Sequence, residues 1–179
     1  MKNISKEAPS TVGRGTEMEY SSLRAEILKR IEMRQQIVSV TLTLAGIFLG
    51  VGLATELVAL IYPPLAMFLA FGWAQNDFRI RDLARYIRER IEGSMPGTGY
   101  ETYVQEQRGK NRGLGSWRFV VLSHGGVFLL TQLMAMGIGL ARFTFDPVGW
   151  VLIGIDVLTA VAVVWLMFQA GRYKTGSYR

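Results

Sequence analysis

The sequence predicts an all-α integral membrane protein in which four transmembrane helices form two hairpins with long cytoplasmic helical extensions. Half of the 179 residues are hydrophobic, and they are gathered in four long blocks separated by charged segments. A helix needs roughly 20 apolar residues to cross about 30 Å of hydrocarbon, and each block reaches about that length. A soluble domain would instead interleave apolar and polar positions along its elements, so a soluble helical bundle is the disfavoured alternative.

The first element is a polar segment, residues 1–16, which we expect to be a disordered tail. Residues 17–92 follow as the first transmembrane hairpin, with spans 37–54 and 57–74. Only Thr55 and Glu56 separate these spans, and one continuous helix of that length would overshoot any bilayer. Because no short basic start precedes an apolar core, we expect no cleavable signal peptide, and the first span should act as an anchor.

Charged helices are predicted to continue the first two spans on one side of the membrane. In both segments apolar residues recur every three or four positions among charged ones, without an intervening Gly or Pro. The apolar residues are Leu23, Ile27 and Ile31 in the first segment and Leu83, Ile87 and Ile91 in the second. We expect these two sets to pack against each other as an antiparallel helical pair.

The segment 93–116 is rich in glycine and is predicted to be a cytoplasmic linker. A second transmembrane hairpin with a short basic tail follows over 117–179, with spans 119–140 and 148–168. The linker stretch GKNRGLGS is not a phosphate-binding loop, because that motif needs Ser or Thr directly after the lysine and Asn111 stands there. The chain has no cysteine, which excludes thiol nucleophiles and cysteine-ligated metals. No cofactor and no metal are expected.

Basic residues set the expected orientation, because Lys and Arg are retained on the cytoplasmic side of a membrane. Nineteen of the 20 lie before the first span, between the second and third, or after the fourth, and only Arg142 lies in a turn on the opposite side. Both termini and the linker are therefore predicted to be cytoplasmic. The lack of cysteine is compatible with the inner (plasma) membrane of a prokaryote, where we expect the protein.

Four residues that interrupt the apolar spans fall near one depth of the predicted bilayer. Asp156, Gln132 and the pair Pro63 and Pro64 lie about 21–24 Å from the cytoplasmic ends of their spans, at 1.5 Å per residue. Proline leaves a carbonyl one turn earlier without its donor, so we expect a protonated Asp156 to point into the bundle, toward Gln132 or such a carbonyl. Asp156 is either a neutral acid that joins helices or a carboxyl that carries a proton or cation or lines a pore.

His124, the single histidine, lies about 9 Å from the cytoplasmic end of its span, too far from Asp156 for a direct pair. We interpret it as an interfacial histidine with satisfied hydrogen bonds, or alternatively as a proton relay or pH sensor. Its neighbours SHGG match part of an esterase oxyanion loop, but the chain lacks the serine elbow of such enzymes. We therefore expect no enzymatic activity.

Three arginines of the second charged helix, Arg81, Arg85 and Arg88, fall on one face. This face is either a solvated surface of positive-inside character or a site for an anionic lipid headgroup or phosphorylated ligand, because guanidinium groups bind phosphate through paired hydrogen bonds. Asp82 and Glu89 dilute its charge. Nonspecific nucleic-acid binding is therefore not expected.

Small residues at a spacing of four predict close helix packing in the membrane. Gly46 and Gly50 form such a pair on the first span, and Ala135 and Gly139 form one on the third. Faces of this kind serve contacts within a chain as often as contacts between chains. The expected partners are the lipid bilayer and further copies of the chain.

The stretches EYSSLRAEILKRIEMRQQIVSVTLTLAGIFLG and LAMFLAFGWAQNDFRIRDLARYIRERIE are similar to those of small uncharacterised prokaryotic membrane proteins with several helices. The hairpin with long cytoplasmic helices also resembles, more loosely, the membrane effectors of nucleotide-signalled anti-phage systems. This resemblance implies membrane permeabilisation or channel activity in response to a cytoplasmic cue. Three classes stay open: a self-associating membrane effector or channel, a small proton-coupled transporter that uses Asp156, and a structural or partner-binding membrane subunit.

Overall fold

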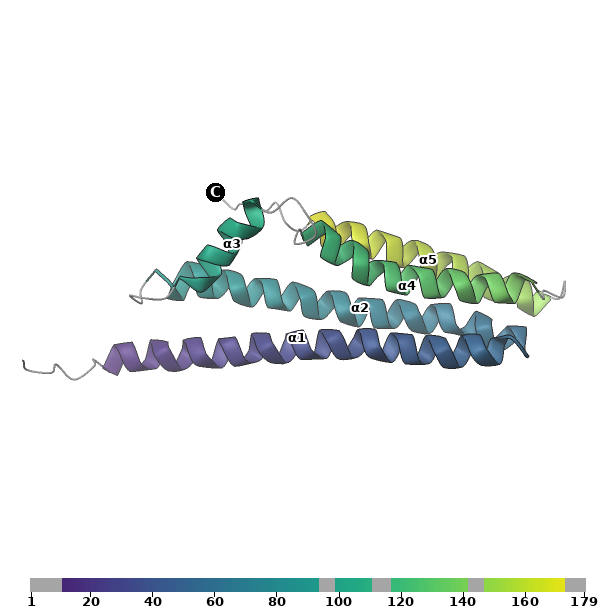
Figure 1. The fold of residues 1–179 in the computed structure, drawn as a ribbon, viewed down its shortest axis with the longest axis horizontal. Coiled ribbons are helices and arrows are strands. Elements are labelled where there is room, and N and C mark those ends of the chain that lie inside the picture. The colour runs from purple at the N-terminus through teal and green to yellow at the C-terminus, as the bar shows by residue number, and fades with distance from the viewer. Residues whose placement is uncertain (1–10, 94–98, 111–116, 142–146, 173–179) are drawn as a thin grey trace, which may run out of the picture.

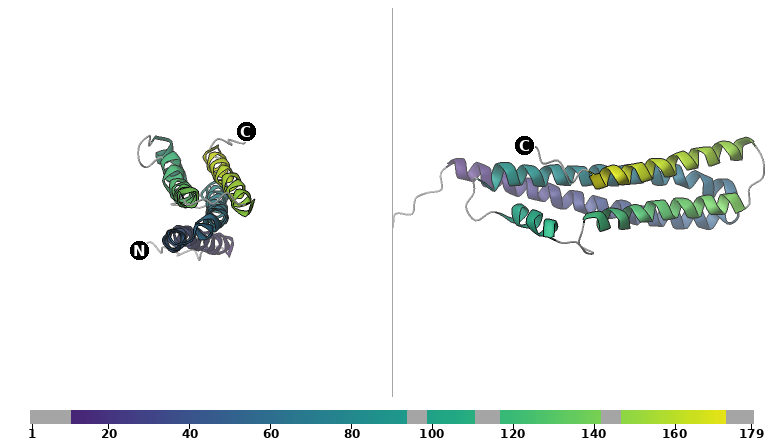
Figure 2. Two further views of the ribbon diagram at one scale, coloured as in Figure 1. Left: turned by 90° about the vertical axis from the view of Figure 1, so that its right-hand side faces the viewer. Right: turned by 90° about the horizontal axis from the view of Figure 1, so that it is seen from above.

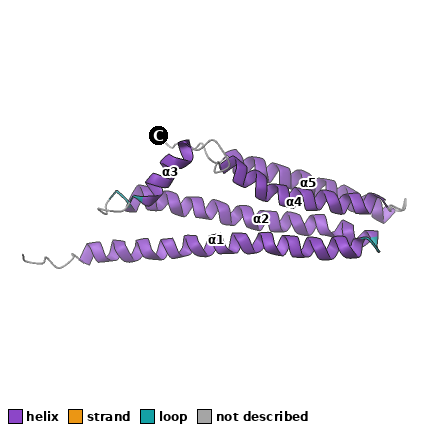
Figure 3. Cartoon of the chain, viewed as in Figure 1, coloured by secondary structure: helices purple, strands orange, loops and turns teal. Residues whose placement is uncertain are grey.

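The computed structural model describes residues 11–93, 99–110, 117–141 and 147–172, and these residues are almost entirely helical, with no strand among them (Figures 1 and 3). The predicted all-α class is confirmed. The elements are α1 (Thr11–Gly52), α2 (Glu56–Tyr86), a π-helical turn η1 (Ile87–Ile91), α3 (Tyr100–Lys110), α4 (Trp117–Ala141) and α5 (Pro147–Arg172).

Four helices are long and apolar enough to cross a membrane, namely α1, α2 with η1, α4 and α5. They cover the four predicted spans except residues 53 and 54, and they indicate a multi-pass membrane protein. With 42 residues, α1 is about 63 Å long at 1.5 Å per residue, roughly twice the hydrocarbon thickness of a bilayer. Accordingly, α1 and α2 lie side by side and extend beyond α4 and α5 at one end (Figure 1). We call this the basic end, after the arginines of α1 and α2 that lie there.

Helix α2 is the centre of the bundle. It packs against α1, α4 and α5, and the end-on view shows it between α1 and the pair formed by α4 and α5 (Figure 2). Its buried positions carry many small side chains, which allow three neighbouring helices to approach its backbone closely. These buried small residues are Ala59, Ala66, Ala70 and Ala74.

The two charged segments pack together beyond the apolar part of the bundle, as predicted. Ile27 of α1 forms a buried cluster with Ile87 and Ile91 of η1, and the other predicted residues pack against it. The spacing explains the π-helical turn. Apolar side chains recur here every four residues, whereas an α-helical turn has 3.6, so a wider turn keeps Ile87 and Ile91 on the face toward α1.

Two helical segments lie outside the helices that the sequence predicts. Helix α1 begins at Thr11, within the predicted disordered tail. Tyr20 already packs against the isoleucine cluster, and adding further turns to an existing helix costs little free energy. Helix α3 lies within the predicted linker. The remaining parts of the tail, the linker, the turn with Arg142 and the C-terminal tail lie outside the described residues: 1–10, 94–98, 111–116, 142–146 and 173–179.

The turn between α1 and α2 depends on a close approach at Gly52. A Cβ added there would lie 2.6 Å from the Ala59 Cβ and 3.2 Å from the Ala59 Cα. Because the α2 backbone would have to move, we expect Gly52→Ala to lower the free energy of unfolding by about 1–3 kcal/mol. Gly50→Ala is the matched control, since a Cβ there meets nothing within 4 Å. Equal losses in denaturant unfolding of the purified protein would contradict this contact.

Candidate functional site

A layer of polar side chains lies inside the four-helix bundle, and every long helix contributes to it. All of its members are buried, and Gln132 and Asp156 are 0% exposed. The members are Thr41 of α1, Tyr62 of α2, Thr131 and Gln132 of α4, and Asp156 and Thr159 of α5. Because four helices supply it, the layer forms only when both hairpins have come together.

The packing register places these residues at similar depths. Ala70 of α2, Phe128 of α4 and Val163 of α5 belong to one buried cluster. Asp156 precedes Val163 by seven residues, or about two helical turns, and Pro63 precedes Ala70 by the same number along a helix of the same direction. Asp156 and Pro63 therefore lie at one level of the bundle.

Hydrogen bonds join α2 to α4 within this layer. The Tyr62 hydroxyl donates to Thr131 Oγ1 at 2.9 Å, and Gln132 Nε2 donates to the Pro63 carbonyl at 2.9 Å. The structure thus brings together Gln132 and Pro63, two of the residues that the sequence assigns to one depth. Tyr62 and Thr131 were missed, although their polar groups stand at the same calculated depth within apolar spans and could have been included on that basis.

The carboxyl group of Asp156 has no hydrogen-bond partner among the described residues, although both of its oxygens are buried. The predicted hydrogen bond to Gln132 is not formed, because the Gln132 amide is directed to Pro63 and its own Oε1 also lacks a partner. The Thr159 hydroxyl donates to the backbone carbonyl of Asp156 at 2.9 Å, not to its side chain. Within the described part of the chain, an ionised carboxylate here would have no hydrogen-bond donor to compensate it.

The prolines do not break the second span. Helix α2 continues as one helix through Pro63 and Pro64. Proline removes one donor and one hydrogen bond, but packing of α2 against three other helices holds the segment in helical conformation. The carbonyl of Pro63 is the acceptor that the bundle uses.

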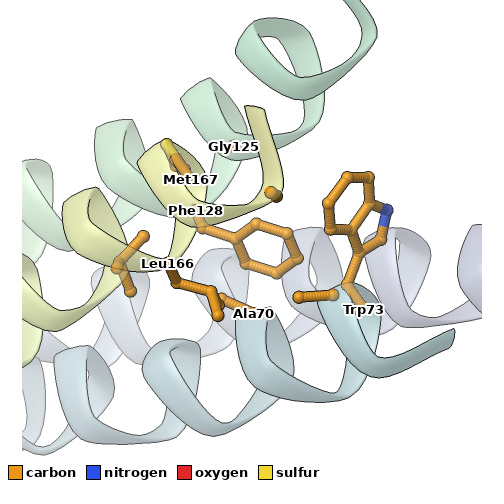
Figure 4. A pocket seen from close by; sticks show the side chains of 9 residues that line it. Ala70, Trp73, Gly125, Phe128, Leu166 and Met167 are labelled. Carbon is orange, nitrogen blue, oxygen red and sulfur yellow. The ribbon is translucent and has the colours of Figure 1, made fainter. Parts of the chain in front are cut away.

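Apolar side chains separate this layer from the basic end. Trp73 of α2, Phe128 of α4 and Leu166 of α5 belong to the buried cluster, and a small pocket lies among them (Figure 4). Its lining comes from α2, α4 and α5. A Cβ at Gly125 would collide with the Met167 side chain across the pocket, so α4 and α5 are close there. We call this layer of apolar side chains the apolar barrier.

Beyond the barrier lies a charged group that we call the boundary cluster, consisting of Arg34, Asp77 and Arg81. Arg34 Nη1 donates to Asp77 Oδ1 at 2.7 Å, and Arg81 forms an ion pair with the other oxygen of Asp77, which is 1% exposed. Arg81 also donates to the Ala170 carbonyl at 3.2 Å. The cluster joins α1, α2 and α5. The sequence signal was the position of Arg34 and Asp77 just outside two adjacent spans.

Pairing within the boundary cluster changes the interpretation of the arginine face. Arg81 is directed toward Asp77 and Ala170, so it does not form one solvated set with Arg85 and Arg88. Arg88 lies 3.4 Å from the Glu89 carboxylate. The expected anion or headgroup site therefore lacks a free Arg81.

His124 also lies near the boundary cluster. Its ring stacks on Trp73, with ring centroids 5.4 Å apart, and its Nδ1 lies 3.3 Å from the Ser123 hydroxyl. The Arg34 guanidinium lies 5.9 Å from the centroid of the same Trp73 ring. These contacts fit the interfacial interpretation of His124, and they keep it apart from the Asp156 layer.

The two pairs of small residues have different surroundings. Ala135 is buried in a cluster with Ala45 and Tyr62, and Gly139 faces the Leu60 side chain so closely that a Cβ would collide with it. Gly46 and Gly50 are exposed, and nothing lies within 4 Å of a Cβ at either position. The α4 pair thus serves packing within the chain, whereas the α1 pair faces outward.

Helix α3 is attached to the end of the long hairpin by Glu92. This carboxylate accepts hydrogen bonds from the backbone N–H groups of Glu101 at 2.7 Å and Thr102 at 3.0 Å, and from the Thr102 hydroxyl at 2.7 Å. Arg24 of α1 forms an ion pair with Glu101 and lies over the Tyr100 ring. The N–H groups of Glu101 and Thr102 lie in the first turn of α3, where backbone N–H groups have no acceptor within their own helix and need one from outside it.

The attachment of α3 is expected to depend on pH. Burial alone would raise the pKa of the Glu92 carboxyl, but the hydrogen bonds from Thr102 and Glu101 and the charge of Arg24 together bring the pKa below its ordinary value of 4.5. Because the pKa of Glu92 is lower when α3 is attached, the charged carboxylate stabilises the attachment at any pH above the ordinary pKa. This stabilisation is lost as the pH falls through the lower pKa of the attached state. A spin label at Tyr103→Cys should therefore become mobile only in strong acid.

Glu92→Gln is the control for this effect. The label should then be mobile already at neutral pH and should respond little to acid, because the titrating group is gone. A label whose mobility rises in acid to the same extent in both proteins would assign the effect to another group.

No family model, no curated protein and no solved structure matches this chain.

Proposed function

We propose that this chain is a non-enzymatic, multi-pass membrane protein that acts as a small proton-coupled transporter, with Asp156 as the group that binds and releases the proton. One observation carries the proposal. Asp156 is fully buried where α5 packs against α2 and α4, and its carboxyl oxygens have no hydrogen-bond partner among the described residues. A carboxyl that only joined helices would be expected to hold a partner in exchange for its desolvation.

The same burial argues against a pore formed between copies of the chain and lined by Asp156 or Gln132. Such a pore needs these side chains at the surface of each copy, whereas both are 0% exposed within one chain. The proposed path therefore runs through the bundle of a single chain. The apolar barrier closes this path toward the basic end.

Proton flux into liposomes is the test. The purified chain is reconstituted into liposomes that contain a pH-sensitive dye, and a pH gradient or membrane potential is imposed. We expect acidification or alkalinisation of the lumen faster than in protein-free liposomes, either alone or on addition of a co-transported solute. Flux equal to that of protein-free liposomes in a screen of solute classes would support the structural-subunit alternative.

The second candidate, a self-associating membrane effector, is favoured by the outward-facing Gly46 and Gly50. Small residues at this spacing let helices of two chains approach closely. Replacing both by isoleucine should reduce chemical cross-linking between copies in the membrane. The matched control is Gly137→Ile, another exposed glycine with nothing within 4 Å of its Cβ. Unchanged cross-linking in both variants would remove this support.

Both functions assume that the basic end faces the cytoplasm, since nineteen of 20 basic residues flank the spans on that side. We expect Thr98→Cys and Ser177→Cys to resist impermeant thiol reagents in intact cells and Thr55→Cys, in the exposed α1–α2 turn, to react. The natural chain has no cysteine, so each variant reports one position. Labelling at Thr98 but not at Thr55 would invert the orientation.

A further inference from the structure

We propose that the half of α5 nearest the basic end is the gate through which Asp156 exchanges protons with the aqueous phase on that side, and that Arg81 holds this gate closed. This inference rests on the proposed function, because a gate is needed only if Asp156 exchanges protons. Its geometry, however, can be tested without any measurement of flux.

The first observation concerns distance and obstruction. Asp156 precedes Ala170 by 14 residues, or about 21 Å along α5. Between them α5 contributes Val163 and Leu166 to the apolar barrier. A proton from the basic end can reach Asp156 only if water enters this barrier, which requires the barrier helices to separate.

The second observation concerns how α5 is held there. The small pocket lies where α2 and α5 meet beside α4, and α2 presents Ala70 and Ala74 to it while α5 presents Ala170 (Figure 4 labels Ala70). At these three alanines no long side chain of one helix interlocks with the other helix, so they contribute few dispersion contacts between α2 and α5. The gate would open where α5 separates from α2 along these alanines, while Val163 and Leu166 hold it against the cluster in the closed state.

The third observation is the bond from Arg81. Its guanidinium donates to the Ala170 carbonyl while it is paired with the buried Asp77, which Arg34 of α1 also contacts. The last carbonyls of a helix lack intrahelical donors and carry partial negative charge, so a cation is favourable there. Arg81 thus fastens the end of α5 to a charged cluster that α1 and α2 hold in place. Removing this bond takes away that attachment of α5, while Arg34 still neutralises Asp77.

The experiment uses Ala70→Cys as a reporter inside the barrier, in the otherwise cysteine-free chain in nanodiscs. Ala70 is 3% exposed, so its reaction with a charged methanethiosulfonate reagent should be slow in the parent. Adding Arg81→Gln should accelerate the reaction about tenfold, the change expected for weakening one charge-assisted hydrogen bond. Arg79→Gln, an exposed arginine two residues away, is the matched control and should leave the rate unchanged.

A second reporter separates gate opening from general loosening. Ala45→Cys lies in the buried cluster between α1, α2 and α4 and should stay unreactive in the Arg81→Gln background. Equal acceleration at both reporters, or no more acceleration by Arg81→Gln than by Arg79→Gln, would overturn the gate.

Flux then connects the gate to the proposed function. Joining Ala74→Cys to Ala170→Cys with a short reducible cross-linker should stop flux, and reduction should restore it. The control joins Ala45→Cys to Ala66→Cys, both in the cluster between α1 and α2, and should leave flux intact. If the parent carries no flux, the proposed function fails, yet the thiol rates still decide the gate. If the parent carries flux and the α2–α5 cross-link leaves it unchanged, the gate fails alone.

Discussion

Asp156→Asn is expected to reduce proton flux to the level of protein-free liposomes while leaving expression and helical content unchanged. The amide has nearly the same shape as the carboxyl but cannot release a proton at accessible pH. No side-chain hydrogen bond is lost, because the Asp156 carboxyl has none among the described residues. Flux in reconstituted liposomes and circular dichroism of the same preparation measure the two halves of this expectation.

Glu89→Gln is the matched control, since it removes an exposed carboxylate at the basic end. Its flux should equal that of the parent. If Asp156→Asn instead retains full flux, the carboxyl serves packing only and the transporter proposal is wrong.

The largest loss of stability is expected for Asp77→Asn. Asp77 is 1% exposed and is paired with both Arg34 and Arg81, whose side chains are 15% and 17% exposed. The substitution leaves two largely buried guanidinium groups without a compensating charge, so we expect the free energy of unfolding to fall by about 3–5 kcal/mol. Denaturant unfolding of the purified protein measures this change.

Asp82→Asn supplies the comparison on the same helix, because Asp82 is exposed. It should change stability by no more than about 0.5 kcal/mol. A loss at Asp77 no larger than the loss at Asp82 would show that the boundary cluster contributes little to the fold.

The spans and the pairing of the charged helices could be predicted because they depend on residues near one another in sequence. A run of apolar residues as long as 148–168 has few stable structures other than a membrane helix. Leu23, Ile27 and Ile31 form one apolar face on the first helix, and Ile87 and Ile91 form one on the second. The hairpin turn brings the two faces together. Local pattern and chain connectivity were therefore sufficient for these elements.

The details of the site depend on helix rotation, which depth along a helix does not determine. Asp156 and Gln132 were predicted at similar depth, but the Gln132 amide donates to the Pro63 carbonyl. The Asp156 carboxyl then has no hydrogen-bond partner among the described residues. The attachment of α3 was equally inaccessible, because Glu92 recognises backbone N–H groups, which carry no sequence signature.

Infrared spectroscopy of the reconstituted chain tests most directly whether Asp156 binds and releases a proton inside the membrane. With isotope-labelled aspartate, we expect the carbonyl stretch of a protonated carboxyl in apolar surroundings. This band should disappear reversibly as pH is raised, and it should be missing from Asp156→Asn. A band that persists unchanged over the whole pH range in which the protein stays folded, or one that survives in Asp156→Asn, would contradict proton exchange at Asp156.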